Sequence, residues 1–203
     1  MKFEGKKILF LTISRSGHHA VINWLTHQCK GVVKYYNNCM LGWENGKLET
    51  LKKNNLKIYN ISSHNITTHI YTIEEFEMPD FEKYNFNALD IDLVIIINRD
   101  FKNWVASCIK GEGESKNRLL EPHKTCRNEI KKGNIFMWEG LIKESLNLTN
   151  YIYNKYHINY NKWFTDIEYR KQISTYLNLD FNDSKLSEVS RYVGGSSFNV
   201  LKI

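Results

Sequence analysis

The first 28 residues carry the pattern that most restricts the fold of this chain: a strand, a turn rich in hydrogen-bond donors, and a helix. The apolar run over residues 8–13 has the length and composition of a buried strand. An amphipathic helix is predicted over His18 to Gln28, with its apolar residues along one face. In an α/β protein this arrangement directs backbone N–H groups and the positive end of a helix at one point, which favours an anion such as phosphate.

The turn from Ser14 to Gly17 has the residue types of a phosphate-binding loop. Arg15 supplies a fixed positive charge, Ser16 a hydroxyl group, and Gly17 a backbone that a ligand can approach closely. It is not the loop of the nucleotide kinases, because their pattern G-x-x-x-x-G-K-[ST] requires Lys and then Ser or Thr directly after Gly17. We therefore expect an anion held by arginine and backbone amides.

A second strand is predicted over Leu93 to Asn98, the strongest strand pattern in the chain. Its unbroken apolar run indicates burial on both faces, and hence a central position in a parallel sheet. Arg99 follows it directly. A guanidinium that emerges from the most buried strand needs a carboxylate or phosphate partner at the edge of the sheet.

Strands and helices alternate along the rest of the chain, which predicts one α/β domain over residues 1–203, with a mainly parallel sheet covered by helices on both faces. Residues 29–55 and 72–90 are interpreted as connections, with only a short strand at Val32-Val33. The other predicted elements are a strand at Leu56–Ile61, a helix at Lys102–Lys110, a polar loop over 111–134, a helix at Ile135–Tyr156, a strand at Ile158–Tyr160 and a helix at Asp166–Leu177.

His64 follows the predicted strand 56–61. In open parallel sheets, ligands collect at the carboxyl ends of the strands, which makes His64 a candidate general base beside the phosphate turn. The alternative is an ordinary surface or capping histidine.

The composition excludes some classes of protein. An apolar fraction of 42% in 203 residues is typical of a globular domain. The net charge of +6 fits an anionic ligand, but basic residues form no run longer than two and no aromatic-basic motif is present, which argues against nucleic-acid binding. No segment has the length of a signal-peptide core or a membrane span, and the four cysteines form no CxxC pair, so we expect reduced thiols in a cytoplasmic protein.

The turn resembles the 5′-phosphosulfate loop of the sulfotransferase family, whose common form is P-K/R-S-G-T-T. Arg15-Ser16-Gly17 matches this form, while Ser14 replaces the proline and His18-His19 replaces the two threonines. A second match is independent of the first. Arg99 at a strand end and Ser107 eight residues later resemble the family's 3′-phosphate motif.

Weaker similarities extend along the chain. Ser62-Ser63-His64 resembles the K-T/S-H segment that carries the family's catalytic base, although Ser62 stands in place of its lysine. Tyr160 lies in a segment that resembles the family's Y-E-D motif. The tail from 191 to 198 occupies the place of its last 3′-phosphate loop, without the R-K-G motif, and its predicted ligand contacts are Arg191, Gly194, Gly195 and Ser196.

The resemblance implies a P-loop nucleotide-hydrolase-like, three-layer architecture and transfer of a sulfuryl group from 3′-phosphoadenosine 5′-phosphosulfate (PAPS) to a hydroxyl or amine. The product would be adenosine 3′,5′-bisphosphate (PAP), and the acceptor a small molecule or glycan. Arg15 and the loop would stabilise the leaving group, and His64 would take the acceptor proton. The predicted cofactor-binding residues are Ser14, Arg15, Ser16, Gly17, His18, His19, Ala20, Arg99, Ser107, Tyr160 and the four tail residues.

His18 and His19 are expected to contact phosphate as neutral donors rather than to bind metal, because neighbouring helical residues do not share a face. Either histidine is an alternative to His64 as the base. We predict no metal site and no membrane span. The sequence does not indicate the oligomeric state. The alternatives to a sulfotransferase are a non-catalytic nucleotide-binding module and a different phosphoryl-transfer enzyme.

Overall fold

The core of the protein is a six-stranded sheet in which most neighbours run parallel. A computed structural model of the chain describes residues 2–44, 47–52, 56–59, 66–74, 86, 89–116 and 132–186. The strands of this sheet are β1 (Lys7–Leu11), β2 (Val32–Tyr36), β5 (Leu56–Tyr59), β6 (Thr67–Ile73), β7 (Leu93–Asn98) and β8 (Lys155–Asn159). Two further strands, β3 (Met40–Glu44) and β4 (Lys47–Lys52), pair with each other as a separate antiparallel hairpin.

The strand order is β5-β2-β6-β1-β7-β8. The last five strands of this order are parallel to one another, whereas β5 runs antiparallel to β2 at the edge. The predicted strand β7 is confirmed, with all six residues buried between β1 and β8. The prediction of an α/β fold with a mainly parallel sheet is therefore confirmed.

Two strands of the sheet differ from prediction. β6 lies next to β1, yet its sequence, TTHIYTI, was not recognised as a strand because it has few aliphatic residues. Its β-branched and aromatic side chains suit a pleated surface as well as aliphatic ones do. The interpretation of residues 29–55 as a connection was also wrong apart from the short strand at Val32-Val33, since these residues form all of β2, β3 and β4.

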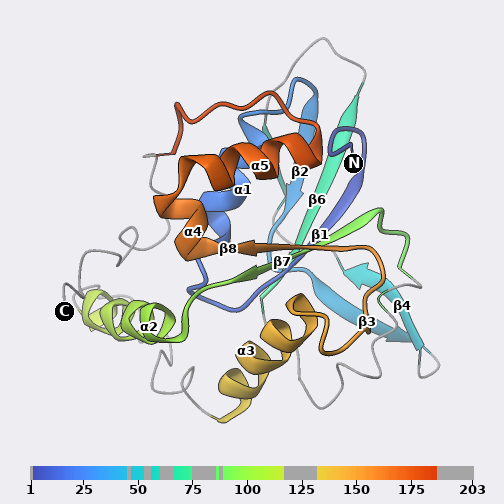
Figure 1. Ribbon diagram of the computed structural model, residues 1–203. Coiled ribbons are helices and arrows are strands. Elements are labelled where there is room, and N and C mark those ends of the chain that lie inside the picture. The colour runs from blue at the N-terminus through green and yellow to red at the C-terminus, as the bar shows by residue number, and fades with distance from the viewer. Residues whose placement is uncertain are drawn as a thin grey trace.

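Helices cover both faces of the sheet (Figure 1). Alternate residues of β1 point to opposite faces, so that Ile8 and Phe10 join one apolar cluster while Leu9 and Leu11 join the other. The first cluster lies under α1 (His18–Thr26), α4 (Tyr160–Thr165) and α5 (Ile167–Leu177). The second lies under α2 (Phe101–Lys116) and α3 (Lys132–Ser145).

The helix predicted over 135–156 ends early, at Ser145. Asn147 adopts a left-handed conformation with φ 57°, which terminates the helix, and the N–H of Leu148 donates back to the carbonyl of Lys143. The chain then turns into β8. The loop predicted over 111–134 is partly helical, because α2 continues to Lys116 and α3 begins at Lys132; residues 117–131 lie outside the described part.

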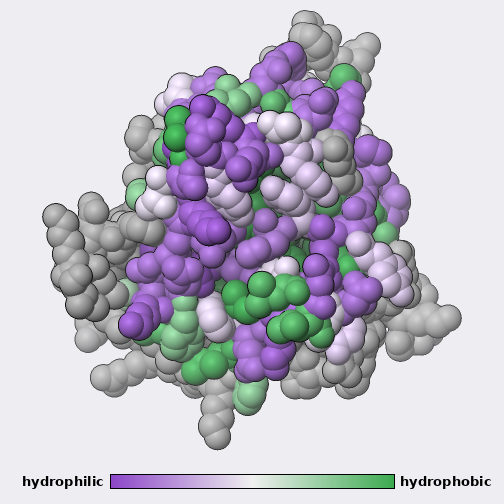
Figure 2. Space-filling view, viewed as in Figure 1, coloured by the Kyte–Doolittle hydropathy of each residue, from purple (hydrophilic) through white to green (hydrophobic). Residues whose placement is uncertain are grey.

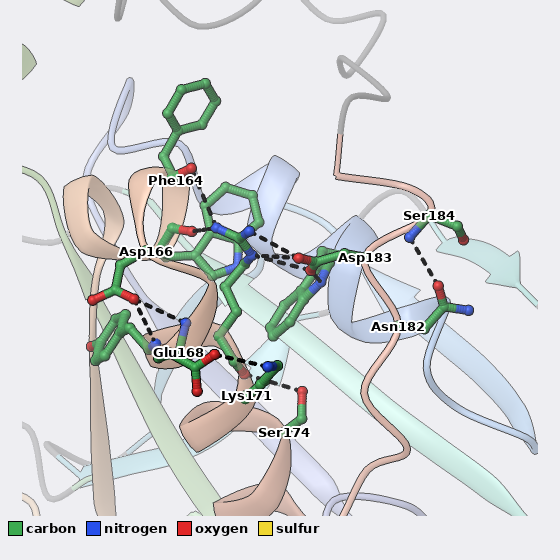
Figure 3. A network of polar contacts seen from close by, with 12 residues as sticks. Phe164, Asp166, Glu168, Lys171, Ser174, Asn182, Asp183 and Ser184 are labelled. Atoms are coloured by element: carbon green, nitrogen blue, oxygen red, sulfur yellow. Dashed lines mark hydrogen bonds and ion pairs between the residues drawn. The ribbon is translucent and has the colours of Figure 1, made fainter.

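An arginine fixes the helices of the first face to one another (Figure 3). Arg170 of α5 binds both carboxylate oxygens of Asp183, with its Nη2 2.8 Å from Oδ2. Its Nη1 donates to the carbonyl of Trp163 at 2.7 Å, and the indole of Trp24 donates to Asp183 Oδ1 at 2.9 Å. α1, α4, α5 and the segment after α5 thus share one polar network, which is partly buried.

On the second face, Glu144 of α3 ties that helix to β8. Its side chain has no exposed surface. The carboxylate accepts hydrogen bonds from the hydroxyl of Thr149 at 2.6 Å and from the N–H groups of Tyr151 and Ile152, and it forms an ion pair with Lys155. Burial alone would raise the pKa of Glu144, but these partners, Lys155 foremost, outweigh it and hold the pKa below its usual range.

Exposed apolar residues occur near the ends of α3. On the face seen in Figure 2, hydrophobic side chains gather over the region of this helix. Apolar residues with more than half of their surface exposed in this part of the chain are Phe136, Leu146, Leu148 and Tyr153. No helix within the described residues is long and apolar enough to cross a bilayer.

We predict that Glu144→Gln lowers the free energy of unfolding by about 3 kcal/mol at pH 7, because it leaves Lys155 buried beside an uncharged group. Glu139→Gln, an exposed change on the same helix, should cost less than about 0.5 kcal/mol. Chemical denaturation measures both values.

The contribution of Glu144 also depends on pH. A carboxylate whose folded pKa is lowered stabilises the fold above the pKa of the unfolded chain and loses that effect as pH falls through the folded value. The difference between wild type and Glu144→Gln should therefore shrink below about pH 4. A difference that stays constant down to pH 3 would contradict this assignment.

Candidate functional site

Four of the five parallel strands, β1, β6, β7 and β8, deliver a polar residue to the same edge of the sheet. β1 is followed by the turn Thr12–Gly17 and β6 by Glu74. β7 is followed by Arg99, and β8 by Tyr160. Because parallel strands end at a common edge, these residues meet there although they are far apart in the sequence.

The chain leaves β1 and β6 toward opposite faces of the sheet. α1, which follows β1, packs in the first apolar cluster, whereas Phe86 and Leu89, between β6 and β7, pack in the second. Neighbouring strands whose connections diverge in this way leave a crevice outside their carboxyl ends, where α/β proteins bind ligands. The candidate site is therefore the space outside β1 and β6.

The turn after β1 presents unsatisfied backbone donors. Arg15 and Gly17 both have left-handed conformations, with φ 68° and 90°. The N–H of Ser16 donates to the carbonyl of Ile13 at 3.1 Å, but the N–H groups of Arg15, Gly17 and His18 donate to no acceptor in the described part of the chain. Successive free amides at the start of a helix form a concavity that binds anions.

Tyr160 closes the floor of the turn. A Cβ atom on Gly17 would lie 2.2 Å from Cε2 of Tyr160, so that only glycine fits here. The guanidinium carbon of Arg99 lies 5.0 Å from the centre of the same ring. Burial lowers the pKa of Arg99, and the nearby Tyr160 opposes that effect, yet an arginine stays charged at physiological pH.

The two predicted arginines lock the turn to α2. Nη1 of Arg99 donates to the carbonyl of Arg15 at 3.3 Å, and Nε and Nη2 of Arg15 donate to the carbonyl of Ser107 at 3.2 and 3.0 Å. The indole of Trp104 donates to the carbonyl of Ser14 at 2.9 Å. Nη1 of Arg15 makes no hydrogen bond within the described residues, and its two N–H groups remain available to a ligand.

Glu74 meets His18 and His19 on the other side of the turn. Its Oε1 lies 3.3 Å from Nε2 of His18 and 3.8 Å from Nε2 of His19, and its Oε2 accepts from the hydroxyl of Ser14 at 3.5 Å. The two imidazole rings are 4.0 Å apart. We define these three side chains, His18, His19 and Glu74, as the His-His-Glu cluster.

The expectation that His18 and His19 diverge was wrong. Side chains in the first turn of a helix point back toward its N-terminus, so both rings extend past the helix end and come together there. Burial, with the adjacent His18 ring, lowers the pKa of His19 to about 3, which keeps it neutral. Burial alone would raise the pKa of Glu74, but the two histidines and Ser14 outweigh it, so the pKa is lowered and Glu74 is ionised.

The structure brings together many of the residues predicted from the sequence. Ala20 lies one residue further along α1 than the cluster and packs against the first apolar cluster. The tail residues Arg191, Gly194, Gly195 and Ser196 lie outside the described residues. The residues gathered at the crevice are Ser14, Arg15, Ser16, Gly17, His18, His19, Arg99, Ser107 and Tyr160.

His64 lies outside the described residues, but the argument that placed it at the site fails. β5, the strand before it, is antiparallel, so the carboxyl end of β5 lies at the edge opposite the turn. Ile66, directly before β6, also lies at that opposite edge, since Val32 pairs with Thr67 at the start of both strands. The premise that His64 follows a strand ending beside the turn is therefore wrong.

Glu74 is the site residue that the sequence interpretation missed. It was overlooked because β6 was not recognised as a strand, and a residue is placed at a strand end only once the strand is known. Recognising TTHIYTI by its β-branched and aromatic content would have placed Glu74 beside the turn.

No family model, curated protein or solved structure matches this chain.

We predict that Gly17→Ala disrupts the turn, because Cβ meets the Tyr160 ring and the residue has a left-handed conformation. The expected loss in the free energy of unfolding is about 2–4 kcal/mol, combining strain and overpacking. Thermal or chemical denaturation measures it.

Gly5→Ala is the matched control. Gly5 also has a left-handed conformation, with φ 75°, but its nearest neighbour, Cγ2 of Ile66, lies 3.3 Å from the added Cβ. It should cost only the strain of about 1–2 kcal/mol. Equal losses in the two variants would show that Tyr160 does not constrain the turn.

Proposed function

We propose that this protein binds PAPS in the crevice outside β1 and β6 and transfers its sulfuryl group to a hydroxyl or amine acceptor. The proposal extends to a P-loop-like architecture, with the anion-binding turn after the central strand β1. The convergence of Arg15, Arg99 and Ser107 carries the proposal, because these residues match the two phosphate motifs of the sulfotransferases and here share one hydrogen-bonded unit.

The geometry suits a ligand with two anionic ends. The free amides of the turn and Nη1 of Arg15 would hold the 5′-phosphosulfate, where negative charge grows on the bridging oxygen as the sulfuryl group departs. Arg99 and Ser107, on the β7 side of the turn, would hold the 3′-phosphate. Ser107 is buried on α2, with 4% of its surface exposed, so its hydroxyl reaches only a ligand that enters beside this helix.

The His-His-Glu cluster supplies a proton acceptor on the β6 side. In place of His64, we assign this role to the cluster, because Glu74 and the neutral His19 lie beside the turn and keep some exposure, 16% and 26% of their side chains. A base so placed would face an acceptor that enters between β6 and the turn.

Binding of PAP tests the nucleotide. We expect wild type to bind PAP by isothermal titration calorimetry and to bind adenosine 5′-monophosphate, which lacks the 3′-phosphate, at least tenfold more weakly. Ser107→Ala and Arg99→Lys should remove most of this difference, since each weakens contact with the 3′-phosphate. Lys102→Ala, which removes an exposed positive charge on the same helix, should leave both affinities unchanged.

Two outcomes would overturn parts of the proposal. Absence of PAP binding to folded wild-type protein would exclude the nucleotide. PAP binding without sulfate transfer from PAPS to a broad panel of hydroxyl and amine acceptors would favour a non-catalytic binding module. Hydrolysis or transfer with ATP instead would favour a different phosphoryl-transfer enzyme.

A further inference from the structure

Three side chains that can ligate a metal ion converge at the His-His-Glu cluster. One ring nitrogen each of His18 and His19 and a carboxylate oxygen of Glu74 all lie within 4.8 Å of one another. Their shared surroundings are largely buried, with 3% of the His18 side chain exposed.

Nδ1 of His19 is hydrogen-bonded to an oxygen atom, the hydroxyl of Tyr35, at 3.0 Å. The hydroxyl of Tyr35 also donates to Oδ1 of Asn37 at 2.7 Å, and Asn37 accepts from the hydroxyl of Thr72 at 3.1 Å. Nε2 of His19 is the ring nitrogen on the side of Glu74.

Nδ1 of His18 is likewise hydrogen-bonded to an oxygen atom, the hydroxyl of Ser16, at 3.3 Å. The hydroxyl of Ser16 is in turn hydrogen-bonded to that of Thr12. Nε2 of His18 is buried and makes no hydrogen bond within the described residues, although it lies 3.3 Å from Oε1 of Glu74.

One buried ring nitrogen, Nε2 of His18, thus has no hydrogen bond in the described part of the chain, and it faces the carboxylate of Glu74. Burying a polar atom without a partner is costly, and a cation between the three side chains would satisfy it. Histidine ligands of metals characteristically hydrogen-bond a neighbouring oxygen through their other ring nitrogen, and Nδ1 of both histidines has such a partner here. The geometry points to a divalent transition-metal site, formed by Nε2 of His18, Nε2 of His19 and the carboxylate of Glu74.

The spacing favours zinc. Tetrahedral ligands about 2.0–2.1 Å from Zn²⁺ lie about 3.3–3.4 Å apart, whereas octahedral neighbours at the same bond length lie about 2.9–3.0 Å apart. The distances from Glu74 Oε1 to the two Nε2 atoms, 3.3 and 3.8 Å, fit the tetrahedral case better. Three protein ligands leave a fourth position, as in zinc sites that bind water or substrate.

This site lies beside the proposed sulfuryl-transfer centre, but it does not depend on the identity of the nucleotide. An ion would occupy the Nε2 atoms, so the metal-bound histidines would be ligands and could not also take the acceptor proton, the role proposed above for the metal-free cluster. The positive charge of the ion would face the same crevice as Arg15. The metal site is inferred without reference to the sulfuryl donor PAPS, and metal binding is measured without any nucleotide.

The test is a titration of EDTA-treated, buffer-exchanged protein with Zn²⁺ by calorimetry, and with Co²⁺ by visible absorption. We expect one ion per chain and the visible bands of four-coordinate Co²⁺ without a thiolate charge-transfer band. Glu74→Gln and His19→Ala should each raise the dissociation constant at least tenfold. His27→Ala, at the C-terminal cap of α1, and the exposed Glu139→Gln are matched controls and should leave it unchanged.

Several results would overturn the site. One is that folded wild-type protein shows no saturable Zn²⁺ binding. Another is that Glu74→Gln and His19→Ala both leave the affinity for Zn²⁺ unchanged. A third is a thiolate charge-transfer band in the Co²⁺ spectrum, which would reveal cysteine ligands. Circular dichroism confirms that each variant is folded. Parallel PAP titrations separate the two proposals: loss of PAP binding with metal binding retained contradicts only the proposed function, and the converse contradicts only the metal site.

Discussion

The parallel pairing of β1 with β6 on one side and β7 on the other is the constraint on which the site depends. Leu11 aligns with Ile73 in one ladder and with Ile96 in the other. This register brings the turn, Glu74 and Arg99 to one edge, although Arg99 lies far along the chain. A shift of one residue in either ladder would reverse the faces of every side chain on the shifted strand and disrupt both apolar clusters.

The conformation of the turn after β1 depends on contacts with residues outside the turn as much as on its own residues. Two of its carbonyl groups accept hydrogen bonds from side chains outside the turn: that of Ser14 from Trp104 in α2, and that of Arg15 from Arg99, the residue after β7. Since a trans peptide points its carbonyl and its following N–H in opposite directions, holding the carbonyl of Ser14 on one side points the N–H of Arg15 to the other. The anion-binding character of the turn is therefore produced by packing on the second face of the sheet.

The sequence predicted those elements whose pattern is local and apolar. β1, β7, α1 and α5 were found because each buries a run or stripe of aliphatic and aromatic residues. The convergence of Arg15 with Arg99 was expected from the resemblance to the two phosphate motifs of the sulfotransferases. β6 was missed because its strand character lies in Thr, His and Tyr, and the direction of β5 is set by its pairing with β2, which the local sequence does not encode.

The His-His-Glu cluster was beyond prediction for a related reason. Helical periodicity separates adjacent residues, but that rule describes side chains inside a helix. His18 and His19 occupy its first positions, where the next turn of backbone is absent and Gly17 bends the chain away. Their meeting with Glu74 depends on a strand order that places β6 against β1, and only the assembled sheet supplies it.

The position of β1 in this sheet also bears on how the protein is made. Its partners in the two ladders lie about 60 and 85 residues further along the chain. During synthesis the first strand therefore leaves the ribosome long before either neighbour, with both edges unpaired and four buried apolar residues exposed. Contacts of such long sequence separation slow folding. The segment that organises the finished molecule is thus among the last to be enclosed, and the nascent chain needs protection there until β7 has emerged.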